Sequence, residues 1–118
     1  MELLVFDAPS HPRLGTQVPA GRVDPGETLE QCLYRELDEE AGITEGRIVR
    51  VLGTWTKRYE NHAYEVRHDG PELPDGWDHV VHGDGDDAGL IFRYRWEPVR
   101  PDLLLFGRPD PILARLLR

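Results

Sequence analysis

The sequence predicts a small α+β protein with several short strands and two helices, folded as a single domain over residues 1–118. A chain of 118 residues is long enough for one hydrophobic core and too short for two. Short segments that are apolar, or that alternate between apolar and polar residues, indicate strands. Two further segments combine a helix-capping residue with apolar positions at helical spacing. Hydrophobic residues make up 39% of the chain and charged residues 31%, which is typical of a soluble globular protein.

Five segments are predicted to form strands, and the clearest of them is 90–99. In that segment Phe92, Tyr94 and Trp96 alternate with Arg93 and Arg95, as expected of a strand with one buried face. The other predicted strands cover 2–6, 47–56, 62–68 and 77–83. The intervening segments 7–21, 69–76 and 83–89 are rich in glycine, proline or aspartate, which is typical of loops and turns.

Two helices are predicted from their end signals. The first runs from about Leu29 to Ala41, because Thr28 is a favourable N-cap and Gly42 stands where a left-handed residue ends a helix. The second covers 110–118, where an aspartate N-cap is followed directly by proline.

Charge and composition exclude several classes of protein. The net charge of -8 argues against sequence-independent binding to a nucleic-acid polymer, which depends on Lys and Arg. No apolar run reaches the roughly 20 residues of a membrane span, and the start of the chain lacks the pattern of a signal peptide. A single cysteine, Cys32, excludes an internal disulfide and favours a cytoplasmic location. It falls among apolar positions, so we expect a packed side chain and not a catalytic thiol.

The apolar stripe of the first helix continues as a stripe of carboxylates. At 100° per residue the stripe consists of Leu29, Cys32, Leu33, Glu36 and Glu40. Glu39 lies beside it, so three carboxylates repel one another at the helix end that is unfavourable for negative charge. A divalent cation would offset both the repulsion between the carboxylates and their unfavourable place at the helix end. Ligands that are all carboxylates suit Mg²⁺, Mn²⁺ or Ca²⁺. A solvated acidic helix end is the alternative.

Residues 21–43 resemble the Nudix box, the signature of the Nudix hydrolases. Its defined positions are all filled, by Gly21, Glu27, Arg35, Glu36, Leu37, Glu39, Glu40, Gly42 and Ile43. The resemblance implies a Nudix fold, an α/β/α sandwich with a mixed β-sheet in which the box forms a loop–helix–loop. It also implies metal-dependent hydrolysis of a small-molecule nucleotide substrate, a nucleoside diphosphate linked to another group. The alternative is a non-catalytic Nudix domain that binds a nucleotide as a sensor.

The resemblance also implies roles for the box residues. Glu36, Glu39 and Glu40 would ligate Mg²⁺ or Mn²⁺, and the Gly21 carbonyl would add a backbone ligand. The side chain of Arg35 would orient the glutamates, and Glu27 would pair with Arg35 or with the box loop. The general base is left open among Glu36, Glu39, Asp84, Asp86 and Asp87. Two further candidates, for contact with a terminal phosphate, are Lys57 and Arg58.

Two departures from the family pattern are visible. Ala20 replaces a usual glycine, which costs little unless that position needs a positive φ. The predicted strand 2–6 begins almost at the start of the chain, where relatives usually carry another strand. If that first strand is lacking, a sheet edge is left open, so we expect a homodimer.

Overall fold

The computed structural model describes residues 1–56 and 59–118. The elements follow one another along the chain as β1 (Glu2–Asp7), a 3-10 turn η1 (Pro12–Leu14), α1 (Leu29–Ala41), β2 (Gly46–Thr56), β3 (Glu60–His68), β4 (Gly76–Val80), β5 (Ile91–Pro98), β6 (Leu104–Leu105), β7 (Arg108–Pro109) and α2 (Pro111–Leu116). The predicted α+β class is confirmed. The predictions made for Lys57 and Arg58 lie outside the described residues.

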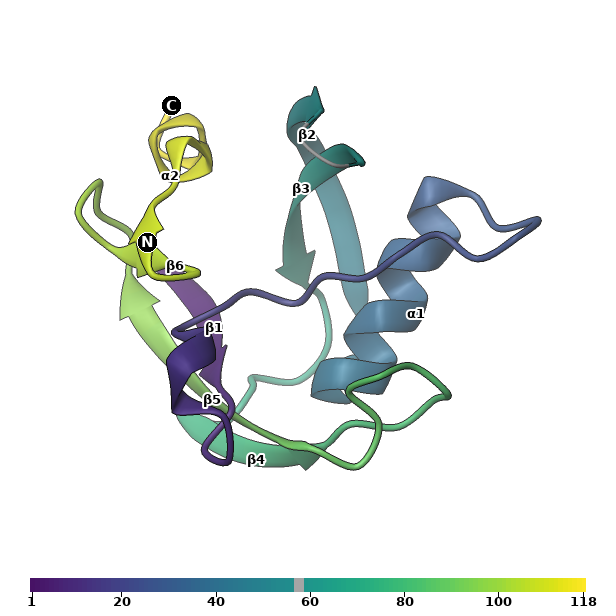
Figure 1. Ribbon diagram of the computed structural model, residues 1–118. Coiled ribbons are helices and arrows are strands. Elements are labelled where there is room, and N and C mark those ends of the chain that lie inside the picture. The colour runs from purple at the N-terminus through teal and green to yellow at the C-terminus, as the bar shows by residue number, and fades with distance from the viewer. Residues whose placement is uncertain (57–58) are drawn as a thin grey trace.

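Three strands form the central sheet, in the order β1-β5-β4. Both neighbours pair with β5 in antiparallel register, so Tyr94 lies opposite Phe6 on one side and Trp77 on the other. The long strands β2 and β3 form a separate antiparallel hairpin, which stands apart from the central sheet in Figure 1. The pairs between described strands are antiparallel, whereas the family resemblance implies a mixed sheet.

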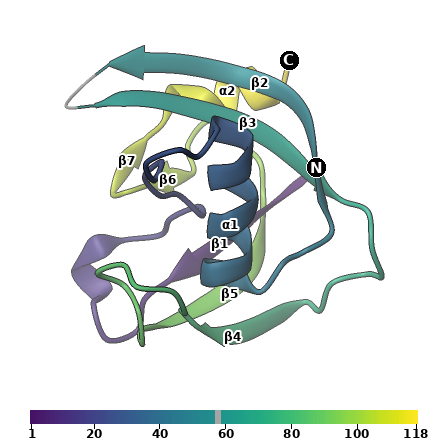
Figure 2. The same ribbon diagram turned by 90° about the vertical axis from the view of Figure 1, so that its right-hand side faces the viewer.

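The two helices cover opposite faces of the central sheet. Phe6 belongs to a buried cluster with Tyr94 and with Ala41 of α1. Its neighbour Val5 points to the other face, where it packs with Leu113 of α2. Because successive strand residues alternate between faces, this gives the α/β/α order of layers. In Figure 2 the helix α1 crosses in front of β1 and β5.

The helix α1 has the predicted bounds and the predicted caps. The Thr28 hydroxyl accepts a hydrogen bond from the Gln31 amide, and the Gln31 side chain accepts one from the Thr28 amide, which makes a complete capping box. At the other end Gly42 is left-handed, with φ 71°. Local signals therefore suffice to place this helix.

Elsewhere the predicted bounds shift and one pair of strands was missed. The predicted strand 77–83 ends at Val80, and the predicted helix 110–118 is shorter, at Pro111–Leu116. The missed strands β6 and β7 have two residues each, too few to show an alternating pattern. Phe106 and Gly107, both with positive φ, join them in a tight turn.

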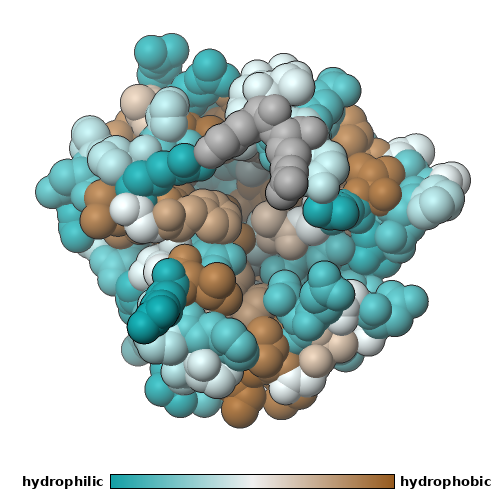
Figure 3. Space-filling view, viewed as in Figure 1, coloured by the Kyte–Doolittle hydropathy of each residue, from teal (hydrophilic) through white to brown (hydrophobic). Residues whose placement is uncertain are grey.

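The helix α2 is tied to the β2–β3 hairpin. Arg115 donates to the Leu52 carbonyl at 3.1 Å, and Arg50 donates to the Leu116 carbonyl at 2.9 Å. Figure 3, drawn from the same side as Figure 1, shows mainly hydrophilic residues on the surface, with smaller hydrophobic areas between them. No helix in the described part of the chain is long and apolar enough to cross a membrane.

Candidate active site

Arg35 is the centre of the polar contacts in the box. Its Nε donates to one Glu27 oxygen at 2.7 Å and its Nη2 donates to the other at 3.0 Å. Its Nη1 donates to Glu36 at 2.8 Å and to Glu39 at 3.2 Å. Nη2 also donates to the Arg22 carbonyl at 2.9 Å. One guanidinium thus connects the box loop to two of the predicted metal ligands.

The Glu27–Arg35 pair is fixed in its charged form. The hydrogen bond from Arg35, followed by one from the Asp24 amide, lowers the pKa of Glu27 to about 2. The hydrogen bond to Glu27 in turn raises the pKa of Arg35 above its usual value. This pair therefore holds the box loop against α1 throughout the ordinary pH range.

Glu40 is the most buried carboxylate of the site. Its exposed fraction is 4%, and its Oε2 is buried without a hydrogen-bond partner among the described residues. Burial raises the pKa of Glu40 well above its usual value, and a hydrogen bond and the charge of Glu36 raise it further. A buried, unpartnered carboxylate oxygen is costly and is a ready ligand for a cation.

Two glycines let the backbone approach the carboxylates. A Cβ built on Gly21 would lie 2.0 Å from the Glu36 carboxyl carbon, and one on Gly83 would lie 2.7 Å from that of Glu39. A side chain at either position would force the carboxylate to move. Gly21 comes from the box loop and Gly83 from the loop after β4, so α1 lies between two loops at this point.

The loop acids lie near this site but are not part of its hydrogen-bonded centre. Asp84, Asp86 and Asp87 are exposed. The charge of Asp87 acts on Glu40 and helps to raise its pKa. Ala20 does not have a positive φ, so its replacement of glycine brings no backbone strain.

The residues present fit a hard divalent cation. Among residues 1–56 and 59–118 no three His, Cys, Asp or Glu side chains are already arranged around one point as a metal cage, and Arg35 contacts the carboxylates of Glu36 and Glu39. The donors are nevertheless all oxygen, as Mg²⁺ and Mn²⁺ prefer. The unpartnered Oε2 of Glu40 and the close approach of Gly21 provide further ligand atoms.

Sequence reasoning missed the side chains that hold the end of α1. Trp77, His79 and Tyr94 each donate to a carbonyl in its last turn. Trp77 also stacks on Tyr94 with ring centroids 5.1 Å apart. No spacing in the sequence could have revealed these contacts, because the donors come from β4 and β5.

Cys32 is buried on α1, as its apolar neighbours suggested. Burial, followed by the charge of Glu27, raises its pKa to about 11. A thiol with so high a pKa is a poor nucleophile near neutral pH, which supports packing as its role.

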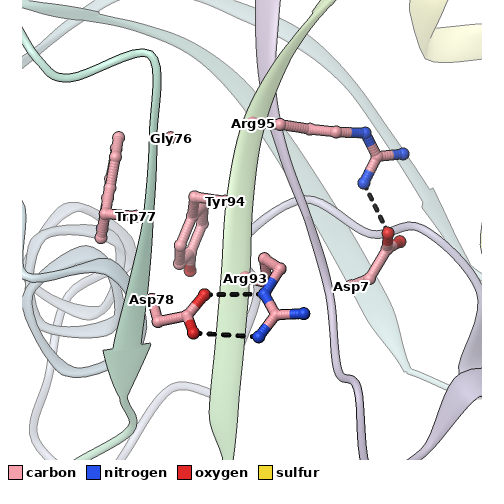
Figure 4. Close-up of a pocket in the computed structure, with 7 residues that line it drawn as sticks. All are labelled: Asp7, Gly76, Trp77, Asp78, Arg93, Tyr94 and Arg95. Carbon is pink, nitrogen blue, oxygen red and sulfur yellow. Dashed lines mark hydrogen bonds and ion pairs between the residues drawn. The ribbon is translucent and has the colours of Figure 1, made fainter.

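A separate hollow of about 540 Å³ lies against the central sheet and contains none of the box residues (Figure 4). It is lined by Asp7, Gly76, Trp77, Asp78, Arg93, Tyr94 and Arg95. Its charged side chains are paired with one another, Asp78 with Arg93 and Asp7 with Arg95. These pairs leave no free charge for a ligand, so the box carries the stronger case for a functional site.

Comparison with known protein families agrees with the fold and with this site. The NUDIX domain family matches residues 2–101, which include the whole of the box. The protein belongs to the NUDIX domain family.

Curated relatives align with shorter stretches of the chain. RNA pyrophosphohydrolase of Aliivibrio fischeri strain MJ11 is 46% identical over 50 residues, which cover 42% of this chain and 29% of the relative. RNA pyrophosphohydrolase of Serratia proteamaculans is 50% identical over 38 residues, 32% of this chain and 21% of the relative. The aligned stretch spans less than a third of the length of these relatives. No solved structure gives a significant match.

Proposed function

We propose that this protein is a metal-dependent hydrolase that cleaves a phosphoanhydride bond in a nucleoside diphosphate linked to another group. The observation that carries the proposal is the buried Glu40 carboxylate with its unpartnered oxygen, next to Glu36 in a complete Nudix box. Such an arrangement is costly for a protein without a cation. Membership of the NUDIX family and the names of the aligned relatives support the same chemistry.

Glu36, Glu39 and Glu40 would hold Mg²⁺ or Mn²⁺, with the Gly21 carbonyl as a backbone ligand. When bound, such an ion would supply neutralisation of phosphate charge and activation of a water molecule for hydrolysis. Arg35 holds Glu36 and Glu39 in place through its Nη1. The contacts of Arg35 support a joint role for Glu36 and Glu39, two of the three proposed ligands.

Of the two box glutamates considered as the general base, Glu39 is the stronger candidate. Its side chain is 22% exposed, compared with 16% for Glu36, and its contact with Arg35 is longer, at 3.2 Å. A base must reach the attacking water and release its proton to solvent, which favours the more exposed and more weakly held carboxylate. Asp84, Asp86 and Asp87, on the exposed loop after Gly83, remain the other candidates.

The substrate we favour is a small nucleotide and not an RNA chain. A net charge of -8 and the acidic loop 84–87 oppose the long backbone contacts that a polymer requires. An RNA 5′ end is the second candidate, because the two relatives reported above are named RNA pyrophosphohydrolase.

The test is a screen for release of phosphate and nucleotide. The panel contains nucleoside triphosphates, dinucleoside polyphosphates, nucleotide sugars, coenzymes and a short triphosphorylated RNA. Each is assayed with Mg²⁺, Mn²⁺ or chelator. Glu40→Gln removes a proposed ligand, and Glu30→Gln on the exposed first turn of α1 is the matched control.

Metal-dependent turnover that Glu40→Gln abolishes and Glu30→Gln preserves is the expected result. Equal turnover by both variants would refute the proposed ligand set. Nucleotide binding without turnover on any substrate would instead favour the sensor alternative. The homodimer and the cytoplasmic location stay predictions, and light scattering at micromolar protein tests the first of them.

A further inference from the structure

The C-terminal end of α1 is held by more hydrogen bonds than its local cap supplies. The last carbonyls of a helix lack partners within the helix. The Gly42 amide donates to the Asp38 carbonyl at 2.9 Å, and the Ile43 amide donates to the Leu37 carbonyl at 3.2 Å. This local cap leaves the next three carbonyls, those of Glu39, Glu40 and Ala41, to be satisfied from elsewhere.

Side chains of the central sheet satisfy those three carbonyls. The pairs are His79 Nε2 with the Glu39 carbonyl at 2.9 Å, Tyr94 Oη with the Glu40 carbonyl at 2.8 Å, and Trp77 Nε1 with the Ala41 carbonyl at 3.2 Å. The His82 amide also donates to the Glu39 carbonyl, at 3.1 Å. A carbonyl can only accept, so His79 donates from a protonated Nε2.

These donors act on the turn that carries the proposed ligands. Unpaired carbonyls at the end of a helix bear partial negative charge, and Glu36 and Glu39 add the charges of their carboxylates to the same turn. Hydrogen-bond donors on the carbonyls reduce this repulsion. They also fix how far the turn extends toward Gly21 and Gly83, whose backbones lie against the carboxylates of Glu36 and Glu39.

His79 has the most direct position of the three side chains. It donates to the backbone of Glu39, a proposed metal ligand and the favoured base. Its ring is seated against the helix end, because a Cβ built on Gly42 would lie 3.1 Å from both Cε1 and Nδ1 of His79. A glycine at the end of α1 therefore leaves the space that the ring occupies.

We propose that His79 is a positioning residue, which holds the backbone of Glu39 so that the carboxylates of α1 are preorganised for a divalent cation. Tyr94 does the same for Glu40. The inference rests on the proposed function, since it concerns the affinity of the same site for its metal. It adds a role for β4 and β5 that lies outside the box.

The experiment measures the dissociation constant for Mn²⁺ alone, by titration calorimetry and by the loss of the free-Mn²⁺ electron spin resonance signal. His79→Leu removes the donor, and His79→Gln places an amide nitrogen near the position of Nε2. Tyr94→Phe removes one hydroxyl and keeps the ring, so it provides a second test with little disturbance of packing. Leu113→Ala, on the opposite face of the sheet, controls for loss of stability alone. Thermal unfolding sets a temperature at which every variant is folded.

We expect His79→Leu to weaken Mn²⁺ binding by about 10-fold or more, as loss of an outer contact to a metal ligand does elsewhere. Tyr94→Phe should weaken it less, and His79→Gln and Leu113→Ala should stay close to the unsubstituted protein. If His79→Leu and Tyr94→Phe both bind Mn²⁺ with unchanged affinity, the positioning role is overturned while the proposed function stands. A loss of Mn²⁺ affinity in Leu113→Ala equal to that in His79→Leu would overturn it as well. If the unsubstituted protein binds no Mn²⁺, the proposed function fails and the inference fails with it.

Discussion

Arg35 donates to both carboxylate oxygens of Glu27, at 2.7 and 3.0 Å, and so locks the start of the box to its helix. Bidentate pairing uses the planar fork of a guanidinium, which an ammonium cannot reproduce. The remaining Nη1 then reaches Glu36 and Glu39. Arg35 therefore keeps two like charges together in the protein without metal.

Arg35→Lys should destabilise the protein although the charge is kept. A lysine ammonium cannot donate hydrogen bonds to Glu27, Glu36 and Glu39 at the same time. We therefore expect the free energy of unfolding in chelator to fall by about 2 kcal/mol. Arg47→Lys is the control, because Arg47 pairs with Asp69 in an exposed position. There the loss should stay below about 0.5 kcal/mol. Urea unfolding of both variants measures the difference, and equal losses would show that Arg35 is not the centre of the site.

Gly21→Ala should weaken binding of divalent metal with little effect on stability. The added Cβ would lie 2.0 Å from the Glu36 carboxyl carbon, so Glu36 must swing away from its place beside Glu40. We expect at least about 10-fold weaker Mn²⁺ affinity by calorimetry, as for other displaced metal-site groups. Gly85→Ala is the control, since nothing lies within 4 Å of a Cβ at that position. An unaffected Gly21→Ala protein would mean that Glu36 binds no metal.

Glu40→Gln should make the protein more stable in chelator and should abolish its stabilisation by divalent metal. The substitution replaces a buried carboxyl group, 4% exposed, whose charged form is disfavoured by burial and by Glu36, by a neutral group of the same shape. In the unsubstituted protein, Mg²⁺ at 100 times its dissociation constant should add about 2.7 kcal/mol to the free energy of unfolding. In chelator, the Tm of Glu40→Gln should be higher than that of the unsubstituted protein. Addition of Mg²⁺ should not raise the Tm of Glu40→Gln further. A Glu40→Gln protein that still gained stability from Mg²⁺ would contradict the proposed role of Glu40.

The sequence predicts the local features of the fold and fails where contacts come from distant segments. Thr28 and Gly42 mark the ends of α1 by chemistry that acts within a few residues, and both were assigned correctly. Trp77, His79 and Tyr94 lie 36, 40 and 54 residues from the carbonyls to which they donate. No local pattern encodes such pairings, because they depend on which face of the sheet receives the helix.

In the candidate site too, the contacts between residues near in sequence were predictable and those from distant segments were not. The resemblance to the Nudix box implied the contact of Arg35 with Glu27, which the structure contains, and both residues lie within one loop and one helix. The approach of Gly83 to Glu39 joins the box to a loop more than 40 residues further along the chain. Only the packing of α1 on β4 and β5 brings that loop to the site.

Glu65 should give stability a distinct dependence on pH. It is 8% exposed and accepts hydrogen bonds from Arg50 at 2.8 Å and Arg67 at 3.0 Å. These contacts, led by that of Arg50, lower the pKa of Glu65 below its usual value. In the unfolded chain a glutamate has a pKa of about 4.3. Because the pKa is lower in the folded protein, the ionised Glu65 stabilises the fold at pH values above the pKa of the unfolded chain. This stabilisation is lost as the pH falls through the pKa of the folded protein.

Glu65→Gln should therefore lower the free energy of unfolding at pH 7 by about 1–2 kcal/mol and have a smaller effect near pH 3. Arg50 also donates to the Leu116 carbonyl, so part of the loss should come from a looser attachment of α2. Urea unfolding from pH 3 to pH 8 measures the dependence, with Glu72→Gln, an exposed glutamate, as the control. A loss that is equal at all pH values would show that the ionised form of Glu65 does not stabilise the hairpin.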